Sequence, residues 1–181
     1  RVHPHASRFE VAEDGSRLRF DTYAATLAQG TLAELSVRAA DGAEAPVLEK
    51  LIVSAKETGW STEDGTLNSL ACLARGPVRS VFRAVKTLKS GHRIERTWYF
   101  YGDRFEVHSS SEPKLGSLTR ATYAQDATAV NESGKSVRMD GKGDGEDFSG
   151  KGTPAWYAVY NAQFRNACLA LTKPSGFTYW D

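Results

Sequence analysis

The sequence predicts an all-β protein, built as an antiparallel β-sandwich with little or no helix. Turn signals recur at intervals of about ten residues, the spacing typical of sandwiches and barrels. Between the turns, apolar and polar residues alternate at a period of two. No segment carries the apolar stripe of an amphipathic helix. The last third keeps the same pattern, in the segments SLTRATYAQD, AWYAVYN, NACLALTKP and GFTYW.

Length and composition predict one soluble globular domain over residues 1–181. The hydrophobic share of 40% and the charged share of 25% are ordinary for such a domain. The chain does not begin with methionine, so we expect a mature chain or a piece excised from a larger protein, in an extracellular or periplasmic location. No stretch reaches the roughly 18 apolar residues that cross a bilayer, so no membrane span is expected.

The first strands lie next to turn signals. Alternation in SRLRFD places Leu18 and Phe20 on one face. The segment APVLEKLIVSA is rich in the aliphatic and β-branched residues that favour strands. The segment 30–42 fits a strand or a short helix, and we prefer a strand because it ends in an Asp-Gly turn. The expected strands span 16–21, 30–42, 45–55 and 66–74.

The middle of the chain predicts a long antiparallel hairpin over 76–91 and its continuation over 92–110. Ser90-Gly91 supplies one turn and Gly102-Asp103 supplies the next. Alternation in the second segment separates two faces, and aromatic residues lie on both. One parity holds Ile94, Arg96, Trp98 and Phe100, and the other holds Arg93, Glu95, Thr97, Tyr99 and Tyr101.

Charge is distributed unevenly, although the net charge is only +1. Residues 75–105 hold eight Lys and Arg residues against two Asp and Glu residues. A basic face attracts polyanions, namely nucleic acid, anionic polysaccharide or acidic protein. The alternative is a solvated sheet face whose arginines pair with carboxylates elsewhere. Nucleic acid is disfavoured as a partner, because the chain is nearly neutral and has no RNA-binding signature.

The segment 139–152 is rich in glycine and carboxylates. It departs from the dinucleotide fingerprint, the P-loop and the EF-hand spacing. We expect a mobile, solvated loop between two strands, because such segments gain little by ordering. The alternative is an irregular Ca²⁺ site, the one cofactor that the sequence suggests. Its ligands would be Asp140, Asp144, Glu146 and Asp147.

The cysteines Cys72 and Cys168 each lie in a strand-like run. There is no CxxC pair and no Cys/His cluster, so a zinc site is not expected. Two alternatives stay open for these residues: a pair of small buried hydrophobic side chains, or one disulfide.

Histidines and tryptophans supply further candidates. His92 and His108 lie on strands or strand edges of the basic segment, and histidine titrates near neutral pH, as a general base requires. Flat aromatic rings stack on sugar faces. Trp98 shares a parity with apolar residues and is expected in the core, whereas Trp60 precedes a polar turn.

The segment 75–113 resembles the galactose-mutarotase-like, or supersandwich, β-sandwich domains of carbohydrate-active enzymes, including polysaccharide lyases of the exo-rhamnogalacturonan type. The matching elements are Gly76-Pro77-Val78-Arg79, Trp98-Tyr99-Phe100-Tyr101 and Arg104-Phe105-Glu106-Val107. The segment 155–171 is similar to a later strand pair of these domains. The resemblance implies a sandwich fold and a carbohydrate-linked role. The chain departs from the family in its short length, and no mutarotase-style His/His/Glu set maps onto it.

Together these features lead us to expect a carbohydrate-binding module whose partner is a polysaccharide or oligosaccharide, preferably an acidic one. A guanidinium group matches a uronate carboxylate through two parallel hydrogen bonds. Alternation places Arg79 and Arg83 with Val81 and Val85, so the candidate arginines cannot all share one wet surface. The ligand-binding candidates are Arg79, Arg83, Arg93, Arg96, Trp60 and Trp156.

Two alternatives belong to other classes. The first is a polysaccharide lyase or sugar epimerase that acts on uronate-containing glycans, in which a cation neutralises the carboxylate and a base takes the adjacent proton. The second is a structural or adhesion module that associates through sheet edges and has no sugar affinity. The candidate bases for the first are His92, His108, Tyr99 and Tyr101.

Overall fold

The structure is a computed structural model of the chain. It describes residues 10–12, 17–38, 42–55, 65–76, 78–112, 117–123, 127–138, 146–147, 156–161, 166–172 and 178–179. Within these ranges every regular element is a β-strand and no helix occurs, which confirms the all-β prediction. The chain divides into two compact units, residues 1–122 and 123–181. A single domain over the whole chain stays a prediction.

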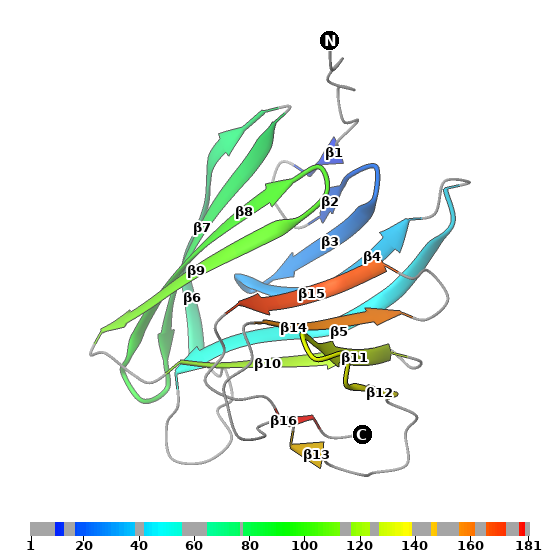
Figure 1. The fold of residues 1–181 in the computed structure, drawn as a ribbon. Coiled ribbons are helices and arrows are strands. Elements are labelled where there is room, and N and C mark those ends of the chain that lie inside the picture. The colour runs from blue at the N-terminus through cyan, green and yellow to red at the C-terminus, as the bar shows by residue number, and fades with distance from the viewer. Residues whose placement is uncertain are drawn as a thin grey trace. The chain divides into compact units, whose positions relative to one another are not determined.

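The first unit contains a six-stranded sheet, which we call sheet A, in the order β1-β2-β3-β4-β5-β10 (Figure 1). The tight turn between β3 and β4 is formed by Gln29 and Gly30, both with positive φ, 52° and 72°. Two such residues give the hairpin turn that matches the natural twist of paired strands. The strands are β1 (Glu10–Val11), β2 (Arg17–Arg19), β3 (Tyr23–Ala28), β4 (Thr31–Arg38), β5 (Glu44–Ala55) and β10 (Ser117–Tyr123).

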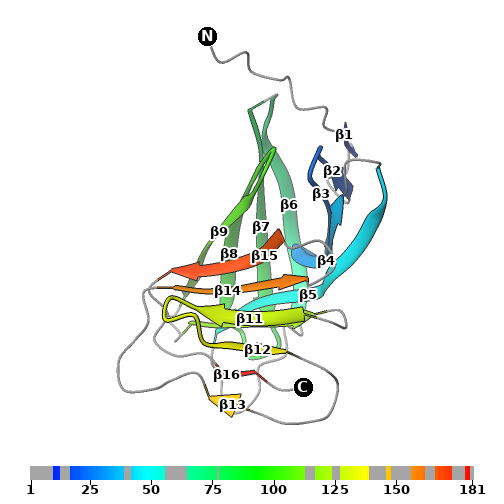
Figure 2. The same ribbon diagram turned by 45° about the vertical axis from the view of Figure 1, so that its right-hand side comes forward.

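The first unit also contains a four-stranded antiparallel sheet, which we call sheet B, in the order β6-β7-β8-β9 (Figure 2). The predicted turn at Ser90-Gly91 joins β7 to β8, and the predicted turn at Gly102-Asp103 joins β8 to β9. The long hairpin and its continuation are therefore confirmed. The strands are β6 (Gly65–Arg75), β7 (Arg79–Leu88), β8 (Arg93–Tyr101) and β9 (Phe105–Glu112).

Sheets A and B pack face to face, which makes the first unit a β-sandwich. The ring centroids of Phe20 and Phe100 lie 6.3 Å apart in a stacked arrangement. The indole nitrogen of Trp98 donates a hydrogen bond of 3.1 Å to the carbonyl oxygen of Gly30 in the β3–β4 turn. Trp98 is completely buried, so this bond satisfies a polar group that would otherwise cost stability in the core.

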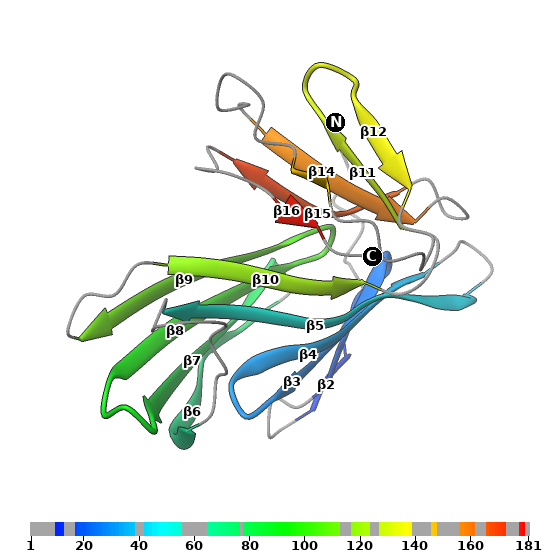
Figure 3. The same ribbon diagram turned by 90° about the horizontal axis from the view of Figure 1, so that it is seen from below.

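The second unit holds a four-stranded sheet, β12-β11-β14-β15 (Figure 3), and a two-stranded pair, β13-β16 (Figure 1). The side-chain oxygen of Asn131 accepts hydrogen bonds from the backbone of Ser133 and Lys135, both at 3.1 Å, which closes the β11–β12 turn. The strands are β11 (Ala127–Asn131), β12 (Ser136–Arg138), β13 (Glu146–Asp147), β14 (Trp156–Asn161), β15 (Asn166–Thr172) and β16 (Thr178–Tyr179).

The glycine-rich segment 139–152 was expected to be a loop, and only Glu146–Asp147 within it is described. These two residues pair with Thr178–Tyr179 as β13 and β16. The rest of the segment lies outside the described residues, so its expected mobility stays a prediction.

Cys72 lies on β6 as an exposed, free thiol. Both alternatives considered for it, a buried hydrophobic side chain and a disulfide with Cys168, are therefore wrong for this residue. The reason is the place of β6 at the end of sheet B, where a side chain has neighbours on only one side. Cys168 lies on β15, and its side chain is outside the described residues.

Candidate ligand-binding face

Alternation along β7 and β8 gives sheet B two chemically different faces. Phe82, Trp98 and Phe100 point into the sandwich and are 1% exposed or less. Residues of the opposite parity lie on the side of sheet B that points away from sheet A. We call this side the outer face. Arg79, Arg83, Arg93, Tyr99, Tyr101 and His108 lie on this outer face. The sandwich core and the candidate site are thus the two sides of the same strands.

Arg79, Tyr99 and His108 form a continuous cluster on the outer face. The guanidinium carbon of Arg79 lies 5.9 Å from the centre of the Tyr99 ring, and the rings of His108 and Tyr99 make a T-shaped contact with centroids 5.2 Å apart. The register explains the contacts: Arg79 pairs with Tyr101 and His108 pairs with Thr97, so both are diagonal neighbours of Tyr99. We call these three residues the Arg79 cluster.

Tyr101 extends this end of the face, because Arg104 stacks on its ring at 4.2 Å. Arg104 also pairs with Asp103 at 3.3 Å and with Glu106 at 3.1 Å. The hydrogen bond to Glu106 raises the pKa of the Arg104 guanidinium. Its charge is therefore offset by two carboxylates. Sequence reasoning missed Arg104 as a site residue, although the Gly102-Asp103 turn beside it was a usable signal.

Arg83 and Arg93 share one carboxylate partner on the outer face, Glu95. Arg83 lies 3.6 Å and Arg93 3.8 Å from the carboxylate of Glu95. The three side chains are 48%, 54% and 35% exposed, so water screens these pairs and each contributes between zero and about 1 kcal/mol. These two arginines fit the alternative interpretation, a solvated face whose cations pair with carboxylates.

Arg79 differs from these arginines. Its side chain is exposed, and no carboxylate of the described residues forms an ion pair with it. A guanidinium that rests over an aromatic ring keeps its in-plane N–H groups pointing outward. Those donors suit a planar carboxylate, so Arg79 is the residue of this face best placed to bind an anion.

Arg96 does not belong with the other candidate arginines. It shares the inner parity with Ile94 and Trp98, and it is only 2% exposed. Its proposed role in ligand binding is therefore corrected: a residue on the inner face, covered by the sandwich, cannot contact a polysaccharide on the outer face. Lys86 is likewise buried, at 7% exposure. The basic segment 75–105 is thus divided between the two faces of sheet B.

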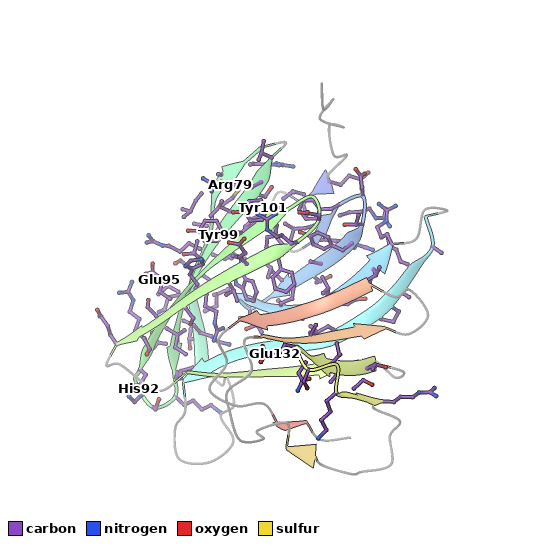
Figure 4. All side chains as sticks on the ribbon, in the orientation of Figure 1. Arg79, His92, Glu95, Tyr99, Tyr101 and Glu132 are labelled. Atoms are coloured by element: carbon purple, nitrogen blue, oxygen red, sulfur yellow. The ribbon has the colours of Figure 1, made fainter. Side chains whose placement is uncertain are left out.

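His92 lies apart from His108. Its ring nitrogen Nδ1 is 2.9 Å from the hydroxyl of Ser90, within the turn between β7 and β8. Figure 4 shows Arg79, Tyr99 and Tyr101 together at one end of sheet B, Glu95 further along and His92 at the far end. Of the four candidate bases, the structure therefore gathers Tyr99, Tyr101 and His108 and leaves out His92.

The remaining candidates fall outside what the structure describes in detail. Trp60, Asp140 and Asp144 lie outside the described residues, and the side chains of Trp156, Glu146 and Asp147 are also not described. Among the residues that are described, no group of three or more His, Cys, Asp or Glu side chains could hold a metal ion. The suggested Ca²⁺ site stays a prediction.

A separate hollow of about 590 Å³ lies in the first unit, where β1 and β2 meet the end of β6. Arg75 reaches across it and donates a hydrogen bond to the carbonyl oxygen of Val11. Arg19 is held at 2.8 Å by Glu44. The hollow was not anticipated from the sequence, because its lining comes from segments far apart in the chain. Its lining residues are Glu10, Val11, Ala12, Arg17, Arg19 and Arg75.

The fold and this face define the class of protein: an all-β sandwich protein with a mixed aromatic and basic sheet face. Comparison with protein-family models, with curated proteins and with solved structures found no match. Within the described residues, no helix is long and apolar enough to span a membrane.

Proposed function

We propose that this protein is a carbohydrate-binding β-sandwich module that takes an acidic polysaccharide on the outer face of sheet B, at the Arg79 cluster. The single observation that carries the proposal is the position of Arg79: exposed, without a carboxylate partner among the described residues, and seated over Tyr99. A uronate carboxylate would supply the missing partner.

The neighbouring side chains support a sugar ring beside that carboxylate. Val81 pairs with Tyr99 across β7 and β8 and is only 6% exposed, so the tyrosines are the side chains that can reach a ligand here. Tyr99 and Tyr101 are both partly exposed, so they offer apolar ring edges and hydroxyl groups to a sugar. Aromatic side chains with a polar end are the common means by which proteins hold amphipathic ligands.

The resemblance to galactose-mutarotase-like domains supports the same class of ligand. The elements that carry it, Arg79, Tyr99, Tyr101 and Arg104, are the residues of this end of sheet B. A polysaccharide partner also favours an extracellular or periplasmic location, where such polymers occur. We therefore propose that the chain is related to these domains.

A second candidate function is cleavage of a uronate polysaccharide by β-elimination, and the contact between Tyr99 and His108 favours it. In that reaction a base takes the proton on the carbon next to the carboxylate. The electron pair forms a double bond, the adjacent carbon–oxygen bond breaks and the leaving oxygen takes a proton. Arg79 would stabilise the charge that develops on the carboxylate, and His108 or Tyr99 would exchange the protons.

The binding proposal is tested by affinity electrophoresis against neutral and uronate polysaccharides at low and raised salt. We expect retention by uronate polymers alone, and weaker retention as salt rises. Arg79→Gln should weaken binding about tenfold or more, because it removes a charged hydrogen-bond donor. Arg83→Gln is the matched control, with the same loss of charge on the same strand, and should bind like the wild type.

Equal losses in the two variants would contradict a site at Arg79. No retention by any glycan would reject the proposal and favour the structural-module alternative. Elimination is tested separately by the ultraviolet absorbance of the conjugated double bond. Absorbance that rises with the wild type and not with His108→Ala or Tyr99→Phe would establish the enzyme. Binding without absorbance would establish the module.

A further inference from the structure

The two edges of sheet B differ in a way that the sugar-binding proposal does not explain. On β9, Glu106, His108 and Glu112 place charged or polar groups along the edge. On β6, no residue from 65 to 74 carries a charge. Natural sheets protect their edges with charges, because the unpaired backbone groups of an edge strand otherwise pair with another chain. The β9 edge has this protection and the β6 edge lacks it.

Strand β6 is also long and accessible. It spans eleven residues, and nine of them are exposed while the other two, Leu67 and Leu70, are half-buried. In the described part of the chain, β6 pairs with β7 and no strand lies on its other side. Among the described residues, two large hydrophobic side chains are exposed. Leu73, 54% exposed, lies on β6, and Val78, 75% exposed, follows the end of this strand.

We propose that the β6 edge is a self-association surface, on which β6 of a second copy of this chain adds in antiparallel register. The two four-stranded sheets would then join into one continuous sheet across a two-fold axis. This inference concerns a different strand from the Arg79 cluster and does not depend on sugar binding.

The charge pattern of β6 argues for a second copy as the occupant. A two-fold axis brings each strand against itself, so any charge near the middle would meet a like charge, which is unfavourable. Residues 65–74 avoid this repulsion, and the one charged residue, Arg75, lies at the strand end. If the partner were a charged protein of another kind, this edge would be expected to carry charges of the opposite sign. Residues 65–74 carry no charge.

The register of β6 shows where pairing would centre. The ladder with β7 shifts between Leu67 and Ser69 and again between Cys72 and Ala74. Between these irregularities, Ser69–Cys72 keeps a regular register with β7. Bulges bend a strand and interrupt its hydrogen bonding, so the regular central stretch is the part that offers a straight edge. Cys72 stands at one end of that stretch with a free thiol.

The test measures molecular mass by sedimentation over a wide range of protein concentration. We expect the wild type to pass from one chain to two as concentration rises. The double variant Ala71→Lys/Leu73→Lys places like charges at the pairing edge, on two exposed residues. It should raise the dissociation constant of the dimer about tenfold or more. Ser110→Lys adds a charge to the exposed β9 edge and should dimerise like the wild type.

A wild type that stays a single chain at every concentration would overturn the proposal. So would a dimer that the double variant leaves unchanged. A second measurement does not depend on those substitutions. In a Cys168→Ala background, mild oxidation of single cysteines at positions 69, 70, 71 and 72 should give a reducible dimer for at least one position. A cysteine at Ser110 should give none. Absence of cross-links at all four β6 positions would also overturn the proposal.

Discussion

The hydroxyl oxygen of Tyr23 lies 2.6 Å from the carbonyl oxygen of Tyr101 and donates a hydrogen bond to it. Tyr23 belongs to β3 of sheet A, whereas Tyr101 ends β8 of sheet B. The same hydroxyl is 2.9 Å from the carbonyl oxygen of Arg104, and the hydroxyl of Thr22 donates to Gly102 at 3.0 Å. These hydrogen bonds fix the β8–β9 turn, which lies next to Tyr101 at the end of the face that carries the candidate site.

Tyr23→Phe should lower the free energy of unfolding by about 1–2 kcal/mol, because it removes the hydroxyl that donates to the part-buried carbonyl oxygen of Tyr101. Urea unfolding followed by circular dichroism measures the change. Tyr99→Phe is the matched control, since the Tyr99 ring lies on the outer face, and it should change stability by no more than about 0.5 kcal/mol. Equal effects of the two variants would mean that the Tyr23 bond is not formed.

Tyr23 should also make the stability of the protein fall at alkaline pH. Burial, with the charge of Asp103 as a smaller cause, raises the pKa of the Tyr23 phenol well above its ordinary value of about 10. Because the folded-state pKa is raised, the stabilisation is fully present below pH 10 and is lost as pH rises beyond it. The loss approaches about 1.4 kcal/mol for each pH unit.

Comparison of wild type and Tyr23→Phe isolates this contribution, because both share the other tyrosines. Urea midpoints at pH 7 and at several values above 10 provide the measurement. The difference in stability between the two proteins should narrow as pH rises. A difference that stays constant over this range would contradict a raised pKa for Tyr23.

Gly30→Ala tests the packing of the two sheets. A Cβ atom at Gly30 would lie 2.7 Å from the Cβ of Ala84 on sheet B, and the φ of Gly30 is +72°. Strain and overpacking together should cost about 3 kcal/mol or more. Gly91→Ala is the control, because Gly91 also has a positive φ of +87° but no atom within 4 Å of its Cβ position. It should cost only about 1 kcal/mol.

Thermal or urea unfolding of the two glycine variants gives the comparison directly. The excess cost at Gly30 measures the close approach of sheets A and B, since the backbone strain is common to both. Similar losses in the two variants would show that the β3–β4 turn does not touch Ala84.

Cys72 should react with a thiol reagent such as DTNB in the native protein, at low protein concentration and without denaturant. The thiol is exposed and free, although its sulfur lies 3.5 Å from the carbonyl oxygen of Ala74. In Cys72→Ser, the thiol that reacts rapidly with DTNB should be absent. If Cys72 reacted only after denaturation, it would be covered or cross-linked in the native protein, contrary to the structure.

Much of the fold was predictable because the strand pattern is local. Strong alternation and Gly-containing turns gave β7, β8 and β9 with their connections, and aliphatic content gave β5. The short strand β3, with the sequence YAATLA, was missed. Its alanines give weak alternation, and its side chains are nearly all buried, so tertiary packing decides its conformation more than its own sequence does.

The candidate site was predictable only in part, because the strand pattern is local whereas contacts between side chains on different strands are not. Parity placed Tyr99 and Tyr101 on one face, and it also showed that Arg96 shares a face with Trp98. The alternation of residues along a strand does not show which carboxylate forms an ion pair with which cation. The pairing of Arg83 and Arg93 with Glu95, and of Arg104 with Glu106, depends on side-chain reach across strands and along them. Arg79 differs from these three arginines because no carboxylate of the described residues forms an ion pair with it.

The central claim is that Arg79 holds a uronate carboxylate on the outer face of sheet B. Calorimetric titration of wild type, Arg79→Gln and Arg83→Gln with a uronate oligosaccharide tests this most directly, with the carboxyl-reduced neutral oligosaccharide as the reference ligand. We expect binding by wild type and Arg83→Gln, at least tenfold weaker binding by Arg79→Gln, and little binding of the neutral ligand. Equal affinity of all three proteins for the uronate, or equal affinity of the wild type for both ligands, would contradict the claim.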